Sequence, residues 1–180
     1  MKKIIIYATI SFSILTANGI LKLEDSKIVN KHSKPVYLKG CNLGNWLMLE
    51  MWMLDYHNFS ENGIEDQYRF IKTLEDRFGN DKAEALMDIY RENWINEDDF
   101  DVVKSYGMNT IRLPFDYKIL MNSDARPFKL KENAWYWLDF AIKVAKSKNM
   151  YVILDMHGAP GRQSGMDHSG RSGYNKLWTN

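Results

Sequence analysis

The sequence predicts a parallel α/β fold, in which strands and helices alternate along the chain. Three apolar runs of strand length, at residues 36–41, 109–115 and 151–156, are separated by segments whose apolar residues recur at helical spacing. Polar or glycine-containing residues follow each run, and the C-terminal ends of parallel strands are where α/β proteins place their chemistry. The order strand, helices, strand, helix, strand therefore indicates successive βα units.

Length, composition and cysteine content favour one globular domain without disulfides. The chain has 180 residues, 45% of them hydrophobic and 26% charged, which is enough to bury a core. A net charge of +1 gives no indication of a nucleic-acid partner. The only cysteine is Cys41, so no intrachain disulfide can form. Six tryptophans and ten tyrosines suit either sugar stacking or core packing, and composition does not separate the two.

The N-terminus has the pattern of a secretory signal peptide. Lys2 and Lys3 precede an apolar run at residues 4–15, and small residues follow up to Gly19. We expect cleavage after about Gly19, leaving a domain of residues 20–180 that is secreted, to the extracellular space or the periplasm. The apolar run is short for a membrane span, so no stable membrane anchor is expected. An uncleaved N-terminal anchor is the alternative.

The first core strand is predicted to follow a β-hairpin. Strand-like runs at 21–30 and 36–41 flank a turn-rich segment at 30–35. Beyond the second run, Glu50 lies in an apolar stretch between Trp46 and Trp52. A charged carboxylate in such surroundings is costly unless it is hydrogen-bonded or binds a ligand.

Residues 60–105 are predicted to form helices. Gly79 can end the first, and Asn96 can cap the last. The acidic residues that follow Asn96 resemble a metal site, but consecutive helical positions point in different directions, so a solvated helix start is favoured; they are Glu97, Asp98 and Asp99.

The second core strand, residues 109–115, contains Arg112 in an otherwise apolar run. A buried arginine is normally paired or reaches the edge of a site. Pro114 cannot donate to a sheet ladder, so the strand is expected to end there. Residues 124–127 are predicted to be a loop. The next helix should pack on the sheet through one apolar face and end near Lys148; that face comprises Ala134, Leu138, Ala141, Ile142 and Ala145.

The third strand is predicted to be buried on both faces and to deliver His157 to its C-terminal end. The loop that follows is rich in glycine and in side chains that hydrogen-bond a many-hydroxyl ligand: Arg162, Gln163, Asp167, His168 and Arg171. A structural histidine followed by a polar surface loop explains the same pattern, and for His157 alone the two interpretations are balanced.

Three stretches then resemble glycoside hydrolase family 5, and most closely its secreted β-glucanase branch, which includes exo-1,3-β-glucanases. They are KGCNLGNWLMLE at 39–50, YGMNTIRLPF at 106–115 and LDMHGAPGRQSGMDHSG at 154–170. Their order and spacing are similar to those of the family from about residue 25 onward. The resemblance implies the N-terminal part, about three βα units, of a (β/α)8 TIM barrel, preceded by a β-hairpin.

The resemblance also implies a retaining mechanism that uses two glutamates. In the family the acid/base follows strand four in an Asn-Glu motif, and the nucleophile ends strand seven. Here the only Asn-Glu pair, Asn96-Glu97, starts a helix before the second strand and does not match the acid. A complete barrel takes about 250 residues. We therefore expect both catalytic glutamates beyond Asn180, and no activity from this chain alone.

The matching residues belong to the substrate-binding surroundings of that active site. By resemblance, Arg112 tunes the nucleophile carboxylate, His157 contacts the sugar beside the cleaved bond, and Glu50 binds hydroxyls of that sugar, as Asp167 is expected to do. Met166 stands where the branch often has an aromatic residue, which puts a stacking contact there in doubt. The resemblance implies a β-glucan oligo- or polysaccharide as partner, no metal or cofactor, and a monomer at full length.

Two other classes of function stay open. One is a non-catalytic carbohydrate-binding protein derived from the same fold, although an open three-stranded sheet would expose an edge and apolar surface. The other is a metal-dependent hydrolase with ligands from Asp155, His157, Asp167 and His168, although the sequence lacks ligand-spaced motifs such as His-x-His. The sequence leaves the glucan linkage, and exo or endo cleavage, undetermined.

Overall fold

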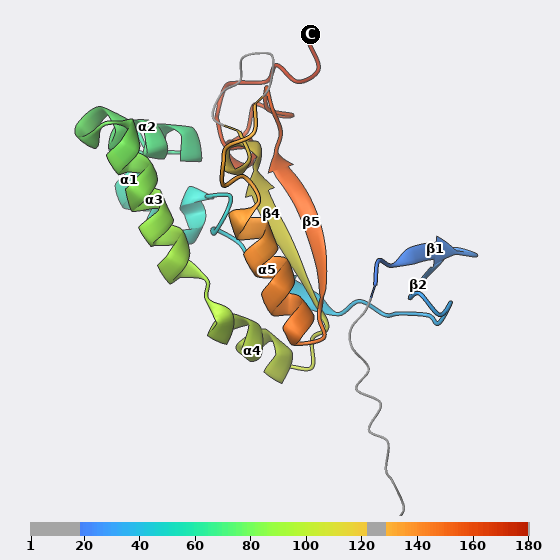
Figure 1. Ribbon diagram of the computed structural model, residues 1–180. Helices are drawn as coiled ribbons and strands as arrows, with labels where there is room; N and C mark the ends of the chain where they lie inside the picture. The colour runs from blue at the N-terminus through green and yellow to red at the C-terminus, as the bar shows by residue number, and fades with distance from the viewer. Residues whose placement is uncertain (1–18, 122–128, 180) are drawn as a thin grey trace, which may run out of the picture.

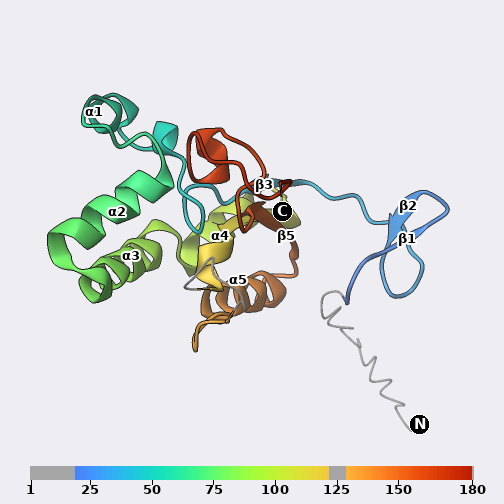
Figure 2. The same cartoon turned by 90° about the horizontal axis from the view of Figure 1, so that it is seen from above.

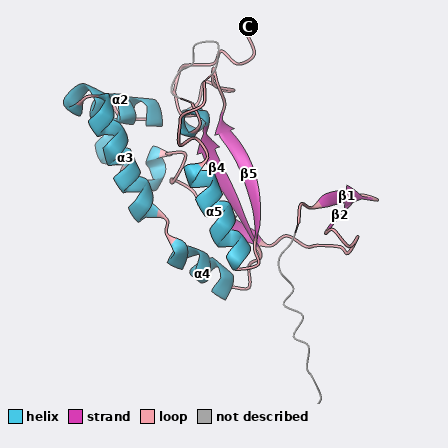
Figure 3. Ribbon diagram, viewed as in Figure 1, coloured by secondary structure: helices cyan, strands magenta, loops and turns pink. Residues whose placement is uncertain are grey.

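The computed structural model describes residues 19–121 and 129–179 and shows a parallel sheet with helices packed against it (Figure 1). The sheet contains β3 (Gly40–Asn42), β4 (Thr110–Asp116) and β5 (Tyr151–Gly158), in that order. Helix α5 (Tyr136–Ser147) lies along one face (Figure 1). The helices gather on one side of the strands, as Figure 3 shows. The predicted parallel α/β order is confirmed.

The strand registers align the C-terminal ends of the sheet. Gly40 pairs with Thr110, and Thr110 pairs with Tyr151, so the strands start level and run in parallel. The prediction that β4 ends at Pro114 was wrong, because Pro114 lies inside the strand and pairs with Asp155. The carbonyl of Arg112 and the amide of Asp116 both bond to the chain that follows β3. Residues 112, 114 and 116 direct their backbone polar groups to the same edge of β4, the edge that faces this chain. The N–H that Pro114 lacks would have pointed to that edge, so the hydrogen bonds between β4 and β5 are complete.

The predicted turn at 30–35 exists, since Val29 and Pro35 form an antiparallel bridge across it, and the structure adds a tighter hairpin before it. Strands β1 (Lys22–Glu24) and β2 (Lys27–Val29) pair antiparallel across Asp25 and Ser26, which have φ of 47° and 63°. Positive φ at both central residues is the geometry of a tight hairpin turn, so the run at 21–30, predicted as one strand, is divided into two. The hairpin lies on the opposite side of the sheet from α2 and α3, seen also from above in Figure 2.

The helical segment between β3 and β4 divides as predicted, with one additional helix. It contains α1 (Tyr56–Glu61), α2 (Gln67–Phe78), α3 (Asn80–Trp94) and α4 (Glu97–Ser105). Gly79, with φ of 79°, ends α2 and allows the sharp turn into α3. Asn96 caps α4 in a reciprocal capping box with Asp99. The acidic triplet is therefore a helix start, as expected.

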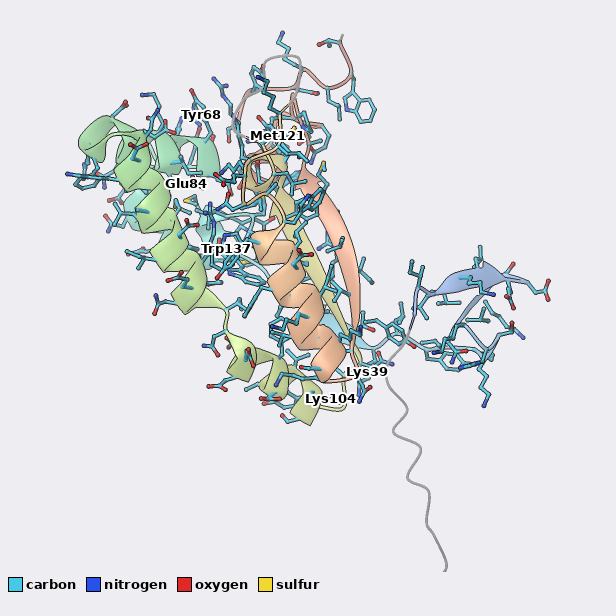
Figure 4. All side chains as sticks on the ribbon, viewed as in Figure 1. Lys39, Tyr68, Glu84, Lys104, Met121 and Trp137 are labelled. Carbon is cyan, nitrogen blue, oxygen red and sulfur yellow. The ribbon has the colours of Figure 1, made fainter. Side chains whose placement is uncertain are left out.

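The main core lies between the sheet and helices α4 and α5. Phe100, Ile111, Leu113 and Ala141 are fully buried there. Trp137, labelled on α5 in Figure 4, packs edge-to-face against Trp46 with the ring centroids 6.0 Å apart. Full burial of a large apolar side chain contributes about 1.5–3 kcal/mol. This core fixes the chain after β3, which carries Trp46, against the strands.

Strand β5 is not buried on both faces, contrary to the prediction. Ile153, Leu154 and Met156 are 43%, 47% and 43% exposed. In the part of the chain that the structure describes, β5 is an edge strand whose only sheet partner is β4. An apolar run of this kind is typical of a strand with neighbours on both sides.

Two sequence-based predictions lie outside the described residues: the signal peptide, apart from Gly19, and the loop at 124–127. Within residues 19–121 and 129–179, no helix is long and apolar enough to cross a membrane.

Candidate active site

A polar row lies at the C-terminal end of the sheet, where β4 and β5 present side chains on the same face. Arg112 Nη2 donates to Asp155 Oδ2 at 2.5 Å. The same carboxylate oxygen lies 2.9 Å from His157 Nδ1. All three side chains are partly buried, with 26–36% of their surfaces exposed. The row is thus protected from bulk water but still within reach of a ligand.

The segment after β3 extends this row with Glu50. Asn45 Oδ1 accepts a hydrogen bond from the Glu50 backbone amide at 2.8 Å. The indole N–H of Trp52 donates to Glu50 Oε2 at 3.0 Å, and Glu50 Oε1 lies 3.7 Å from His157 Nε2. The structure therefore brings Glu50, Arg112 and His157 together. One carboxylate oxygen of Glu50 is thus occupied by a hydrogen bond from Trp52. The Trp52 side chain is itself 61% exposed.

Asn45 and Tyr90 support this segment, and sequence reasoning missed both roles. Asn45 has φ of 57° and is buried, and its carbonyl accepts the Tyr90 hydroxyl hydrogen at 2.5 Å. Burial raises the pKa of Tyr90 well above its usual value, which keeps the phenol a hydrogen-bond donor. The Gly44-Asn45 pair within a polar exit from a strand was the available signal, since asparagine tolerates positive φ.

The loop after β5 is tied to the strand end by Gln163. Its side-chain amide donates to the His157 carbonyl at 2.5 Å and accepts from the Ala159 amide at 3.1 Å. The Gln163 carbonyl in turn accepts the Trp178 indole N–H at 2.9 Å. Gln163 therefore holds loop and strand and does not point toward a ligand, as its polar character had suggested.

A buried ion pair between Asp116 and Arg162 lies beneath the same loop. Arg162 Nη1 donates to Asp116 Oδ2 and, at 2.8 Å, to the Ser169 carbonyl. Burial raises the pKa of the Asp116 carboxyl, and the Arg162 guanidinium opposes that rise by stabilising the charge. A Cβ at Gly158 or Gly170 would lie 2.9 Å or less from the paired groups, so a side chain at either position would have to displace the ion pair. Sequence reasoning missed this pair, because its members lie 46 residues apart.

The loop is also fixed to the start of α2. The buried Asp66 caps α2 through the Arg69 amide and accepts from the Ser172 amide at 2.8 Å. The Tyr68 amide donates to the Gly170 carbonyl at 2.9 Å, and Figure 4 labels Tyr68 on α2. Arg171 stacks on the Tyr68 ring, 3.8 Å from its centroid. These contacts give the loop a second anchor, outside the sheet.

Asp167 lies beside the polar row and is not joined to it. It begins η3 (Asp167–Ser169), and its carboxylate is 4.0 Å from His168 Nδ1. The rings of His168 and His157 have centroids 6.1 Å apart, so the loop runs close to the row. Among the described residues, no hydrogen bond or ion pair links Asp167 to Arg112, Glu50 or His157.

The geometry gives Asp155 and His157 a cationic neighbour. Arg112 contacts both of them, and a fixed positive charge opposes the binding of a metal cation at the same atoms. Over the described parts of the chain, no group of three or more His, Cys, Asp and Glu side chains is arranged to hold a metal ion.

The family model for Cellulase (glycosyl hydrolase family 5) matches residues 78–180, which include β4, β5 and the loop described above. The chain belongs to glycosyl hydrolase family 5. Its fold is accordingly part of a (β/α)8 barrel preceded by a β-hairpin, and the resemblance seen in the sequence is confirmed.

Curated proteins similar to this family 5 chain include glucan-acting enzymes from fungi. It is 35% identical over 156 residues to the probable glucan 1,3-beta-glucosidase A of Aspergillus clavatus, covering 85% of this chain and 35% of that protein. It is 31% identical over 172 residues to glucan 1,3-beta-glucosidase 1 of Schizosaccharomyces pombe, covering 90% and 40%. A beta-xylosidase of Phanerodontia chrysosporium is 36% identical over 149 residues, covering 83% and 30%.

Solved structures agree with the family 5 fold. The rutinosidase from Aspergillus niger superposes with a TM-score of 0.64 at 23% identity, over 78% of this chain and 38% of that one. A structure described as AoRut gives 0.62 at 24% identity, over the same shares. At such identities the likeness concerns the fold alone. The family 5 chain spans 30–40% of the length of the curated relatives described above.

Proposed function

We propose that this chain forms the N-terminal part of a retaining glycoside hydrolase that cleaves O-glycosidic bonds of β-glucans. The observation that carries the proposal is the row of Glu50, His157 and Arg112 at the C-terminal end of a parallel sheet in a family 5 chain. In (β/α)8 barrels this end of the sheet holds the active site. The similarity to proteins named glucan 1,3-beta-glucosidases supports a β-glucan as substrate.

Each residue has a role that fits its chemistry. Arg112 carries a permanent positive charge and five N–H donors, so it can hold and stabilise a nucleophile carboxylate. His157 and Glu50 are partly buried and adjacent, which suits hydrogen bonding to sugar hydroxyls. Asp167 lies on the loop and can contact an additional sugar hydroxyl from there. Its only ion-pair neighbour among the described residues is His168, which is outside the polar row.

We place both catalytic glutamates on segments outside this chain. Retention requires two carboxyl groups about 5–5.5 Å apart across the scissile bond. Glu50 is engaged by Trp52 and His157, and Glu97 is an exposed residue that begins α4. Neither has the position of an acid/base or a nucleophile. The polysaccharide would thus bind here and be cleaved with groups from elsewhere in a longer, monomeric protein.

The proposal includes secretion. The basic and apolar pattern of residues 1–19 is typical of a signal peptide, which leaves a catalytic-domain segment at 20–180. Extracellular or periplasmic polysaccharide is then accessible to the enzyme. No cofactor is part of the proposed reaction, since acid/base and nucleophilic carboxylates suffice.

The test measures the binding of short glucans to the full chain by NMR titration or calorimetry. Laminaritriose and cellotriose should bind with dissociation constants near the millimolar range, about 4 kcal/mol of binding free energy. The α-linked maltotriose serves as the sugar control. Glu50→Gln and His157→Ala should each weaken binding about tenfold, as loss of one good hydrogen bond does.

Two exposed residues provide matched controls, Glu97→Gln for the carboxylate and His32→Ala for the imidazole. They should leave the affinity unchanged. Equal binding of maltotriose, or equal loss in the control variants, would contradict the proposed site.

A further inference from the structure

Asp155 is the member of the polar row to which the family resemblance assigned no role. One oxygen of its carboxylate, Oδ2, lies 2.5 Å from Arg112 Nη2 and 2.9 Å from His157 Nδ1. Arg112 Nη2 and His157 Nδ1 are themselves 3.3 Å apart. Three polar atoms therefore meet at one point, and their hydrogens have to be distributed among them consistently.

For the neutral ring of His157, the close contact of Nδ1 with the Asp155 carboxylate favours one distribution. A guanidinium has donors and no acceptor, and a carboxylate has acceptors and no donor. With Asp155 ionised beside Arg112, His157 Nδ1 satisfies the carboxylate when it carries the hydrogen. A neutral imidazole has one N–H, so Nε2 then holds a lone pair. That lone pair faces Glu50, whose Oε1 is 3.7 Å away.

We infer that Asp155 is a positioning residue, which fixes neutral His157 as the Nδ1–H tautomer and so makes Nε2 a hydrogen-bond acceptor toward the ligand. The inference deepens the proposed function and rests on it for the identity of the ligand. His157 Nε2 and Glu50 Oε1 then form two adjacent acceptors. Two neighbouring hydroxyls of a sugar can donate one hydrogen to each, which matches a vicinal diol.

Removing Asp155 should reverse the tautomer. Without the carboxylate, the group closest to His157 Nδ1 is the guanidinium of Arg112, which can only donate. Nδ1 would then accept from Arg112 Nη2, and the single ring hydrogen would move to Nε2. The acceptor beside Glu50 would become a donor pointing at the Glu50 carboxylate, which closes the site to hydroxyl donors.

The experiment is nitrogen-15 NMR of the imidazole rings in the full chain, at a pH where the histidines are neutral. The chain has four histidines, and a His157→Gln variant identifies the signals of His157. In the unchanged protein the Nδ1–H form should exceed the Nε2–H form roughly tenfold or more, as expected for a hydrogen bond to a charged group. In Asp155→Ala the ratio should invert.

Asp155→Asn is the conservative variant, because its amide oxygen can still accept from both neighbours. It should keep the Nδ1–H form. If Asp155→Ala does not fold, Asp155→Leu, which removes the acceptor at similar size, takes its place and should invert the ratio. The exposed His32 provides an internal reference that should not change in any variant.

A predominant Nε2–H form in the unchanged protein, or an unchanged ratio in folded Asp155→Ala, would overturn the inference. The NMR measurement needs no sugar, so its result is independent of the glucan-binding test. The expected tautomers without glucan binding would reject the proposed function alone.

Discussion

The carboxylate of Asp116 and the guanidinium of Arg162 form an ion pair that is almost completely withdrawn from water, with side chains 1% and 6% exposed. It connects the last residue of β4 to the loop after β5, and Arg162 also bonds to the Ser169 carbonyl. We predict that Asp116→Asn and Arg162→Met each lower the free energy of unfolding by roughly 3–5 kcal/mol, because each leaves a buried charge unpaired. Urea denaturation of the full chain measures this.

The exposed pair Lys72–Asp76 on α2 is the control for that measurement. Lys72→Met should leave the free energy of unfolding nearly unchanged, because exposed i,i+4 ion pairs contribute little. Similar losses for the buried and exposed pairs would show that the Asp116–Arg162 pair has no special role in the loop.

In a catalytically complete protein that contains this segment, we predict that Arg112→Ala and His157→Ala each lower kcat/KM by about 10²–10³-fold. The reason is lost charge stabilisation and positioning near the reacting bond, worth ~3–4 kcal/mol. Steady-state kinetics on laminarin or an aryl β-glucoside, with circular dichroism to confirm folding, is the measurement. Arg77→Ala, at the exposed end of α2, is the control. Wild-type kinetics in either active-site variant would remove that residue from the proposed site.

The 180-residue chain alone is predicted not to hydrolyse glycosidic bonds. Cleavage requires an acid for the leaving oxygen and a second carboxylate at the anomeric carbon. Arg112 stays protonated, and His157 has no partner nucleophile among the described residues. The assay uses laminarin, mixed-linkage glucan and aryl β-glucosides, in a preparation free of host glucanase. Turnover that Glu50→Gln abolishes would show that the chain carries its own catalytic pair.

Stability in acid should depend on Glu84, which is labelled on α3 in Figure 4. Partial burial raises the pKa of Glu84, but its 2.8 Å hydrogen bond from Lys131 and its proximity to Arg91 outweigh this and leave the pKa below its usual value. The ion pair therefore stabilises the fold above the unfolded pKa, about 4.3, and loses this effect as pH falls through the folded pKa.

Urea denaturation of wild type and Glu84→Gln between pH 2.5 and 7 tests this prediction. Half of the Glu84 side chain is exposed, so the difference at neutral pH should be about 1 kcal/mol or less. It should shrink toward zero at the acid end. A gap that widens on acidification would have the wrong sign.

Secretion with cleavage near Gly19 is the remaining prediction, from the basic and apolar pattern of residues 1–19. N-terminal sequencing of the exported protein should start at or near Ile20. Replacing Lys2 and Lys3 by glutamate should reduce export, since the basic region is part of the signal. An intact Met1 on a membrane-bound product would contradict the prediction.

The sequence predicted the parts of the fold that depend on local patterns. Gly79 and Asn96 mark helix boundaries through backbone and capping preferences, and the structure confirms both. Arg112, Glu50 and His157 came together because each follows or lies in a strand that ends at the same edge. The turn at 30–35 is present as predicted, but the tight turn at Asp25-Ser26 was missed, because Asp-Ser is a weaker hairpin signal than Asn-Gly or Asp-Gly.

Contacts between distant segments could not be predicted in the same way. The Asp116–Arg162 pair and the Asn45–Tyr90 contact join residues 46 and 45 positions apart, and no periodicity reports such pairings. Likewise, an apolar strand such as β5 has the same sequence whether its second edge is paired or open. Tertiary packing decides these features, and a single sequence does not indicate which distant residues come into contact.

The attachment of the β5 loop to Asp66 affects any attempt to exchange parts between relatives. Ser172 and Gly170 bond to the first turn of α2, about a hundred residues earlier in the chain. The loop and the start of α2 are therefore one transferable unit. A chimaera that imports the corresponding loop of a relative should also import the helix start that receives it, or the new loop will lack one of its two anchors.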